Sequence, residues 1–216
     1  MQISILCTDP NHPVLKSLQA WMEEMSSKGH SATIVLDKAE LQGGDILFLV
    51  SCGQIIRDAE RKKYKATLVL HASDLPKGRG WSPHTWSILD GASQITLSLL
   101  EASEPVDSGA IWLKTKIALE GHELLPEINA KLFAAELLLM TQAVEQFESI
   151  KPLQQVGETG PYMPKRSSAD SRLDPNKTIA EQFDLLRVVD SKRYPAFFDY
   201  RGKRYLIKVE KVENEQ

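Results

Sequence analysis

Residues 66–81 read Ala-Thr-Leu-Val-Leu-His-Ala-Ser-Asp-Leu-Pro-Lys-Gly-Arg-Gly-Trp, and this stretch both predicts the fold and points to a site. Its first five residues form a mostly apolar run, which is typical of a buried strand. His71 follows directly, at the edge of the expected sheet, where an imidazole either titrates and donates to a substrate or caps a turn. Lys77 and Arg79 place two cations on a glycine-containing backbone, which suits either a bound phosphate or a solvated turn.

Three more short apolar runs precede this stretch, and together they predict a parallel sheet. The expected strands are residues 3–7, 32–36 and 45–50, with a helix at 14–28 and a short helix or turn at 57–65. Strands that alternate with helices are typical of an α/β fold, so we expect a Rossmann-like, mostly parallel sheet. Neither the glycine pattern of dinucleotide-binding folds nor a P-loop occurs in the sequence.

The second half of the chain predicts the remaining elements and a boundary between two parts. Residues 152–164 are polar and contain proline and glycine, so they predict a linker or surface loop. We therefore expect one domain over residues 1–150 and a small C-terminal helix and hairpin subdomain over residues 151–216. The other expected elements are a helix at 83–89, strands at 95–101 and 111–119, a long helix at 123–150, a helix at 178–188, and a hairpin of 197–200 and 203–209.

The composition is that of an ordinary globular protein and argues against several classes. The 216 residues are 42% hydrophobic and 25% charged, and a net charge of -3 gives no general attraction for nucleic acid or an anionic membrane. The apolar run at 46–50 is far shorter than the roughly 20 residues of a membrane span, and the N-terminus lacks the basic segment of a secretory signal. Cys7 and Cys52 form neither a disulfide framework nor a metal motif, so we expect no metal and a cytoplasmic location.

Strand ends are where an open α/β sheet binds its ligands. The relevant ends here are residues 51–56, 71–80 and 103–109. Asp107 precedes a serine and a glycine, and such a sequence most often forms a turn. A carboxylate that faced His71 would instead hold the imidazole in its charged form. The residues by themselves leave both interpretations of Asp107 open.

Three segments, taken in order and with their spacing, resemble the formyltransferase family. They are residues 71–80, then Trp-Ser-Ile-Leu-Asp-Gly at 86–91, then Asp-Ser-Gly-Ala-Ile at 107–111. The family carries a histidine in H-x-S-L-L-P-x-x-x-G and then an aspartate in D-x-G. The separation between those two residues in the family is the separation between His71 and Asp107 here.

This resemblance covers residues 1–119, and residues 171–174 and 194–198 are similar to the family's tail region. It implies the formyltransferase fold, with the catalytic domain at 1–150, and N10-formyltetrahydrofolate as the co-substrate. The whole chain is most similar to nucleotide-sugar N-formyltransferases, particularly that of the pseudaminic-acid pathway, and is too short for the full tRNA-binding barrel of methionyl-tRNA enzymes. The implied partners are the folate and a UDP-linked 4-amino-4,6-dideoxy hexose.

The resemblance also implies roles for individual residues. His71 would stabilise the oxyanion formed at the formyl carbon, and Asp107 would keep His71 in the right state and help to carry the proton. Tyr194 and Phe197 would either sandwich a nucleobase or pack the hairpin onto the sheet. The folate would lie against Gln54, Ile55, Ile56, Ser103, Val106 and Asp107, largely through backbone groups. The sugar nucleotide would meet Ser73, Lys77, Arg79, Trp81, His84, Tyr194 and Phe197.

Val69 departs from the family, which has asparagine two residues before the histidine. That asparagine donates to the formyl oxygen, and losing such a donor costs about 10²–10³ in rate unless Ser73, a backbone N–H or a water replaces it. Two alternatives therefore stay open, a formyltetrahydrofolate hydrolase and a folate or nucleotide-sugar binding protein without turnover. The apolar face of the expected long helix either belongs to the core or forms a homodimer interface.

Overall fold

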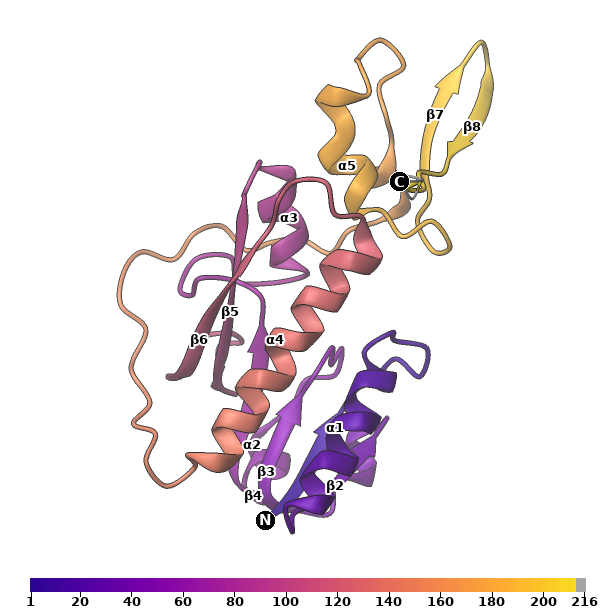
Figure 1. Cartoon of the computed structure of the whole chain (residues 1–216). Coiled ribbons are helices and arrows are strands. Elements are labelled where there is room, and N and C mark those ends of the chain that lie inside the picture. The colour runs from indigo at the N-terminus through magenta and orange to yellow at the C-terminus, as the bar shows by residue number, and fades with distance from the viewer. Residues whose placement is uncertain (213–216) are drawn as a thin grey trace.

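A computed structural model describes residues 1–212 and shows a six-stranded sheet with helices packed against it (Figure 1). The strand order is β2-β1-β3-β4-β5-β6. The first four strands are parallel, and β5 and β6 continue the sheet in antiparallel fashion. The strands are β1 (Gln2–Leu6), β2 (Ser31–Val35), β3 (Gly44–Leu49), β4 (Tyr64–His71), β5 (Gln94–Glu101) and β6 (Ile111–Ala118). The predicted Rossmann-like, mostly parallel sheet is confirmed.

Helices α1 (Leu15–Ser27) and α4 (Leu125–Glu145) cover one face of this sheet (Figure 1). Alternate residues of the central strands, among them Ile5, Phe48 and Leu68, pack against their apolar faces in the main core. The intervening residues point to the other face, where Leu6, Leu47 and Leu49 form a second cluster. Because Val69 packs against this second cluster, Val69 and His71 lie on the face opposite α1 and α4.

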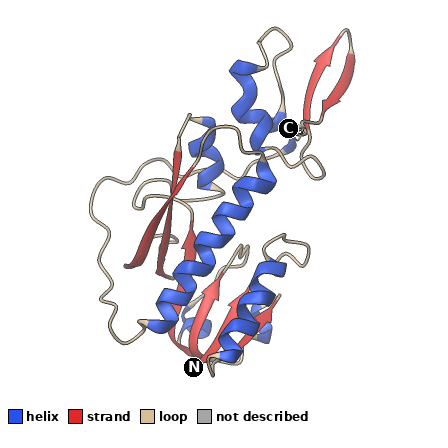
Figure 2. Cartoon of the chain, viewed as in Figure 1, coloured by secondary structure: helices blue, strands red, loops and turns tan. Residues whose placement is uncertain are grey.

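The remaining elements are short, and those of the C-terminal part of the chain stand together beyond one end of the sheet (Figure 2). None of the helices within residues 1–212 has the length and apolarity needed to cross a bilayer. These elements are α2 (Asp58–Arg61), α3 (Pro83–Leu89), α5 (Phe183–Val188), the hairpin β7 (Ala196–Tyr200) and β8 (Lys203–Ile207), and 3₁₀ turns at Lys38–Glu40, Ser168–Ser171 and Ala180–Gln182.

The prediction of a helix over 123–150 is wrong at both ends. Helix α4 starts at Leu125 because Glu123 bends the chain before it, its carboxylate accepting from the backbone N–H groups of Glu120 and Gly121 at 2.9 and 3.0 Å. Its regular part ends at Glu145 and passes into turns. The face predicted to be apolar packs into the main core.

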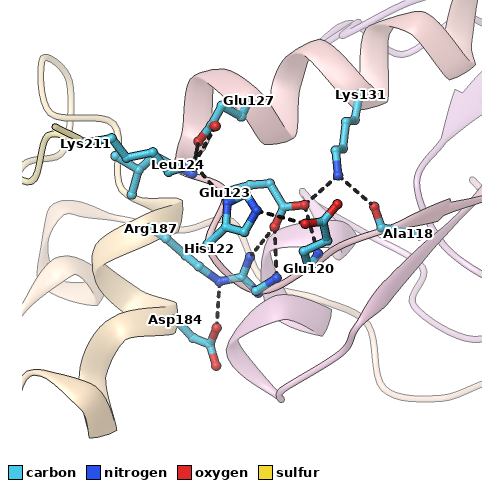
Figure 3. A network of polar contacts seen from close by, with 11 residues as sticks. Ala118, Glu120, His122, Glu123, Leu124, Glu127, Lys131, Asp184, Arg187 and Lys211 are labelled. Carbon is cyan, nitrogen blue, oxygen red and sulfur yellow. Dashed lines mark hydrogen bonds and ion pairs between the residues drawn. The ribbon is translucent and has the colours of Figure 1, made fainter. Parts of the chain in front are cut away.

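A buried ion network attaches the C-terminal part to this core (Figure 3). The carboxylate of Glu123 is 2.5 Å from Lys131 Nζ and 3.7 Å from Arg187 Nη1 of α5, and the side chains of Glu123 and Arg187 are only 2% and 3% exposed. The Nε–H of Arg187 also donates to Asp184 at 2.7 Å. Burial acts to raise the pKa of Glu123, but the bonds from Lys131 and the backbone outweigh it and lower the pKa to about 2. Glu123 therefore stays ionised and binds α5.

Glu136 places a second acid inside the core, on α4. It is 7% exposed, and its Oε2 accepts no hydrogen bond from the part of the chain that the structure describes. Burial raises its pKa to about 8, so the group is neutral at pH 7.

The substitution Glu136→Gln is expected to flatten the pH dependence of stability. Because the folded pKa lies above the ordinary value of 4.5, the stability is full below that pH and is lost as the pH rises towards about 8. The loss amounts to about 1.4 kcal/mol per pH unit, and glutamine, which does not titrate, removes it. Urea denaturation of both proteins between about pH 5 and about pH 8 measures the two slopes. Equal slopes would contradict the prediction.

Candidate active site

His71 is the last residue of β4 and is 7% exposed. Its Nε2 lies 2.8 Å from the carbonyl oxygen of Gly78, and because a carbonyl only accepts, Nε2 carries the proton of this bond. The other nitrogen, Nδ1, lies 3.7 Å from Oδ1 of Asp107, which is a close electrostatic contact rather than a hydrogen bond. The structure therefore places the predicted histidine and aspartate together.

Asp107 reaches His71 by a route that the strand pattern does not indicate. Strand β5 runs antiparallel to β4, so its end at Glu101 pairs with Leu68, in the middle of β4. The carboxyl end of β5 therefore points in the opposite direction to that of β4. The loop after β5 reaches back instead, and the N–H of Gly80 donates to Oδ2 of Asp107 at 3.0 Å. A positive φ of 60° lets Asp107 make this turn.

Residues 72–82, between His71 and α3, form a loop that carries Lys77 and Arg79, and we call it the cationic loop. Its backbone contacts the His71–Asp107 pair at Gly78 and Gly80. Lys77 is exposed, Arg79 is half-buried, and the ring of Trp81 is 40% exposed with Lys165 Nζ 4.9 Å from its centre. The hydroxyl of Ser73 is buried and has no hydrogen-bond partner among residues 1–212. Burial, together with the neighbouring His71, lowers the pKa of His84 to about 4, so this imidazole is neutral at pH 7.

The two loops predicted to hold the folate lie side by side. The guanidinium of Arg61 joins them, since it donates to the carbonyl of Ile56 at 3.1 Å and lies 3.9 Å from the carboxylate of Glu104. Ile55 and Val106 are 57% and 46% exposed, which leaves one apolar side chain on each loop open to a ligand.

The polar side chains of these two loops are already engaged. The Oε1 of Gln54 accepts from the backbone N–H of Lys38, and its Nε2 donates to the carboxylate of Asp37. The hydroxyl of Ser103 forms a hydrogen bond with that of Ser108. The backbone and the two apolar side chains are therefore what remains for a ligand.

Tyr194 and Phe197 lie in the C-terminal part of the chain, on and before β7. The ring of Phe197 is 8% exposed, and the guanidinium of Arg204 lies 4.1 Å from its centre. This contact lies within the hairpin, since Arg204 belongs to β8, and both roles considered for Phe197 stay predictions. Tyr194 is 41% exposed, and its carbonyl accepts from Ser171 Oγ. Helix α5 of this part packs against α3, which carries His84.

The segment expected to be a linker or surface loop is an irregular stretch whose backbone is bound beside the site. Its backbone pairs with Ile111 through Leu153 and, through Met163, with the residues on either side of Gly80. A Cβ on Gly80 would come within 2.4 Å of the Met163 carbonyl, so the close approach requires glycine there. We call residues 152–166 the strap. The irregular strap has no hydrophobic period, so no pattern in the sequence indicated where it docks.

Within the described residues, no group of three or more His, Cys, Asp or Glu side chains is arranged to hold a metal ion. The chemistry available to the site is that of an imidazole, a carboxylate, a buried hydroxyl and two nearby cations. An imidazole beside a carboxylate moves protons and stabilises a developing oxyanion.

The sequence model of the family described as formyl transferase matches residues 8–144, which is more than half of the chain. The chain belongs to this family. His71 and Asp107 both lie inside the matched segment, and the fold described above is the family's fold. The formyl donor of the family is N10-formyltetrahydrofolate.

Among curated relatives, the chain is 30% identical over 174 residues to the methionyl-tRNA formyltransferase of Rickettsia prowazekii. That alignment covers 78% of this chain and 55% of the relative, so the chain spans about half the length of the curated relatives it matches.

Three solved structures share the fold of this chain. Methionyl-tRNA formyltransferase from Clostridium thermocellum superposes with a TM-score of 0.83 at 23% identity, over 100% of this chain and 95% of that one. HypX from Aquifex aeolicus in complex with tetrahydrofolic acid gives 0.78 at 25% identity, over 97% and 37%. A 4-N formyltransferase from Francisella tularensis gives 0.69 at 17% identity, over 98% of both chains.

Proposed function

We propose that this protein transfers the formyl group of N10-formyltetrahydrofolate to the primary amine of a nucleotide-linked amino sugar. The observation that carries the proposal is the buried contact of His71 with Asp107, 3.7 Å apart, beside the loop that holds Lys77 and Arg79. The preferred acceptor is a UDP-linked 4-amino-4,6-dideoxy hexose of the kind used in pseudaminic-acid synthesis. The enzyme works on small molecules in the cytoplasm.

Two features favour a sugar nucleotide over a charged tRNA. The net charge is -3, whereas a protein that binds a nucleic acid neutralises several phosphates with lysine and arginine. The cations near the site are few and local, and Lys77 and Arg79 match the two phosphates of a diphosphate.

The transfer follows from the positions of the two buried groups. The neutral amine bonds to the formyl carbon, the bond from that carbon to N10 of the folate breaks, and a proton passes from the amine to N10. His71 stabilises the oxygen that becomes negative, and Asp107 keeps the imidazole oriented and accepts or returns the proton. The folate lies against the backbone of residues 54–56 and 103–107, between the exposed side chains of Ile55 and Val106.

Ser73 supplies the donor that Val69 lacks. Val69 lies on the same face of β4 as His71 but carries no polar atom. The hydroxyl of Ser73 is buried and has no hydrogen-bond partner within the described residues. The Ser73 side chain lies next to Gly78, whose carbonyl oxygen accepts from His71. An unsatisfied buried hydroxyl is free to donate to a substrate oxygen.

Ser73→Ala is accordingly expected to lower kcat by about 10²-fold, because it removes this donor, while leaving the melting temperature nearly unchanged, because no protein hydrogen bond is lost. Adding Val69→Asn to this variant restores the family's donor and should recover most of the rate. Steady-state kinetics and thermal unfolding of the three proteins test the assignment. A Ser73→Ala enzyme with wild-type kcat would rule it out.

The function itself is tested by mass spectrometry of reaction products. The protein is incubated with N10-formyltetrahydrofolate and a panel of UDP- and dTDP-linked amino sugars, with a methionyl-tRNA arm and a tube without acceptor. A sugar that gains one formyl group supports the proposal and identifies its acceptor. Folate turnover without acceptor would identify a hydrolase, formylated tRNA would redirect the proposal, and folate binding without any turnover would indicate a binding protein.

A further inference from the structure

The strap, residues 152–166, contacts both loops of the site. Near its start, Leu153 pairs in both directions with Ile111, just after the loop that carries Asp107. Further along, the N–H of Met163 donates to the carbonyl of Arg79 at 2.7 Å, and its carbonyl accepts from the N–H of Trp81 at 3.0 Å. Gln155 lies between Leu153 and Met163 in the sequence. Its side chain contacts the cationic loop and the loop of residues 102–110, which we call the aspartate loop.

The side-chain amide of Gln155 makes contacts through both its nitrogen and its oxygen. Its Nε2 donates to the carbonyl oxygens of Asp107 and Gly109, each at 2.9 Å, so both of its hydrogens are engaged with the aspartate loop. Its Oε1 lies 3.5 Å from Nη2 of Arg79, on the cationic loop. One neutral side chain thereby ties the aspartate loop to the cationic loop.

The aspartate loop needs such support because of its backbone conformation. Asp107 has a φ of 60°, a left-handed conformation that is uncommon for a residue with a side chain. The backbone at Gly109 passes so close to Glu101 that an added Cβ would lie 1.9 Å from its carbonyl oxygen. Bonds to the carbonyls of Asp107 and Gly109 hold the turn at its strained residue and just after it. The turn then directs the carboxylate of Asp107 toward His71 and Gly80.

We infer that Gln155 is a positioning residue for the reaction. By holding the carbonyls of Asp107 and Gly109, it keeps the Asp107 carboxylate between His71 and the N–H of Gly80, and it fixes Arg79 relative to that carboxylate. Its effect on turnover rests on the proposed formyl transfer. Its effect on the Asp107–Gly80 hydrogen bond does not.

Two variants and a matched control separate this role from simple packing. Gln155→Ala removes all three contacts of the side chain. Gln155→Glu keeps an oxygen near Arg79 but turns oxygens toward the two carbonyls, so it removes only the support of the aspartate loop. Gln154→Ala is the control, since Gln154 is the same residue type one position earlier, is exposed, and makes no side-chain hydrogen bond within residues 1–212.

The experiment measures kinetics and the amide proton shift of Gly80 in a ¹⁵N-correlated NMR spectrum of each full-length protein. We expect both Gln155 variants to lower kcat at least ~10-fold with a smaller change in KM, since a misplaced group costs turnover more than binding. We also expect the Gly80 amide proton to move upfield toward its position in Asp107→Asn, while Gln154→Ala matches wild type in both readouts.

An unchanged Gly80 amide in Gln155→Glu would overturn the inference, whatever the kinetics. A shifted amide with wild-type kcat would overturn it as well, because the carboxylate would then need no support. Should the wild-type protein fail to transfer formyl groups, the proposed function falls, and the Gly80 shift still decides whether Gln155 holds the aspartate loop.

Discussion

Replacing His71 by alanine is expected to lower kcat for formyl transfer by about 10³-fold, the largest catalytic effect of any single change in this protein. His71 is the one imidazole in contact with Asp107, and its Nε2 is oriented by the Gly78 carbonyl at 2.8 Å. Removal leaves the developing oxyanion without its charged or proton-donating partner. Asp107→Asn should cost about 10²-fold, because it removes the carboxylate and keeps the shape of the side chain.

The double variant, His71→Ala with Asp107→Asn, tests whether these two side chains act together in catalysis or independently. If His71 and Asp107 act together, the combined change lowers kcat little more than His71→Ala alone, because effects of groups that act as a unit are not additive. His30→Ala serves as the control, since His30 lies before β2 and contacts the N-terminal amine rather than the site. Additive losses in the double variant would contradict the assigned roles. So would a fully active His71→Ala.

Replacing Glu123 by alanine is expected to destabilise the protein by about 3–5 kcal/mol, the largest effect on stability. The change leaves the guanidinium of Arg187, 3% exposed, facing a cavity instead of a carboxylate, and it removes the acceptor for two backbone N–H groups of the turn before α4. The attachment of α5 to the core depends on the same contacts (Figure 3). Urea denaturation measures the change in the free energy of unfolding.

An exposed pair provides the comparison for this prediction. Glu24 and Lys28 form an ion pair on α1 with side chains 52% and 39% exposed, and Glu24→Ala should cost well under about 1 kcal/mol. The pH dependence gives a second check, because the pKa of Glu123 is lowered to about 2. Its contribution is therefore present above the ordinary value of 4.5 and is lost as the pH falls through about 2. A Glu123→Ala protein as stable as Glu24→Ala would refute the assigned role of the network.

The elements that the sequence predicted well are those whose local pattern and burial agree. The runs at 3–7 and 45–50 are apolar on both sides because both faces of a central parallel strand are covered, and they form β1 and β3. The helix expected at 83–89 is α3, which has proline in its first turn and ends before Gly91. The ends of α4 were missed because the Glu123 carboxylate, a feature of the tertiary structure, decides where its first turn begins.

The sequence by itself determined the fold class, because the hydrophobic period of strands and helices is a local property, and its resemblance to the formyltransferase family pointed to His71 and Asp107. Only the tertiary structure decided that these two side chains meet, since β5 runs antiparallel and its loop must reach back to β4. It also decided that Gln155 ties the aspartate loop to the cationic loop. Such contacts join residues far apart in the chain through irregular backbone, whose position depends on the packed surfaces around it and carries no period of its own.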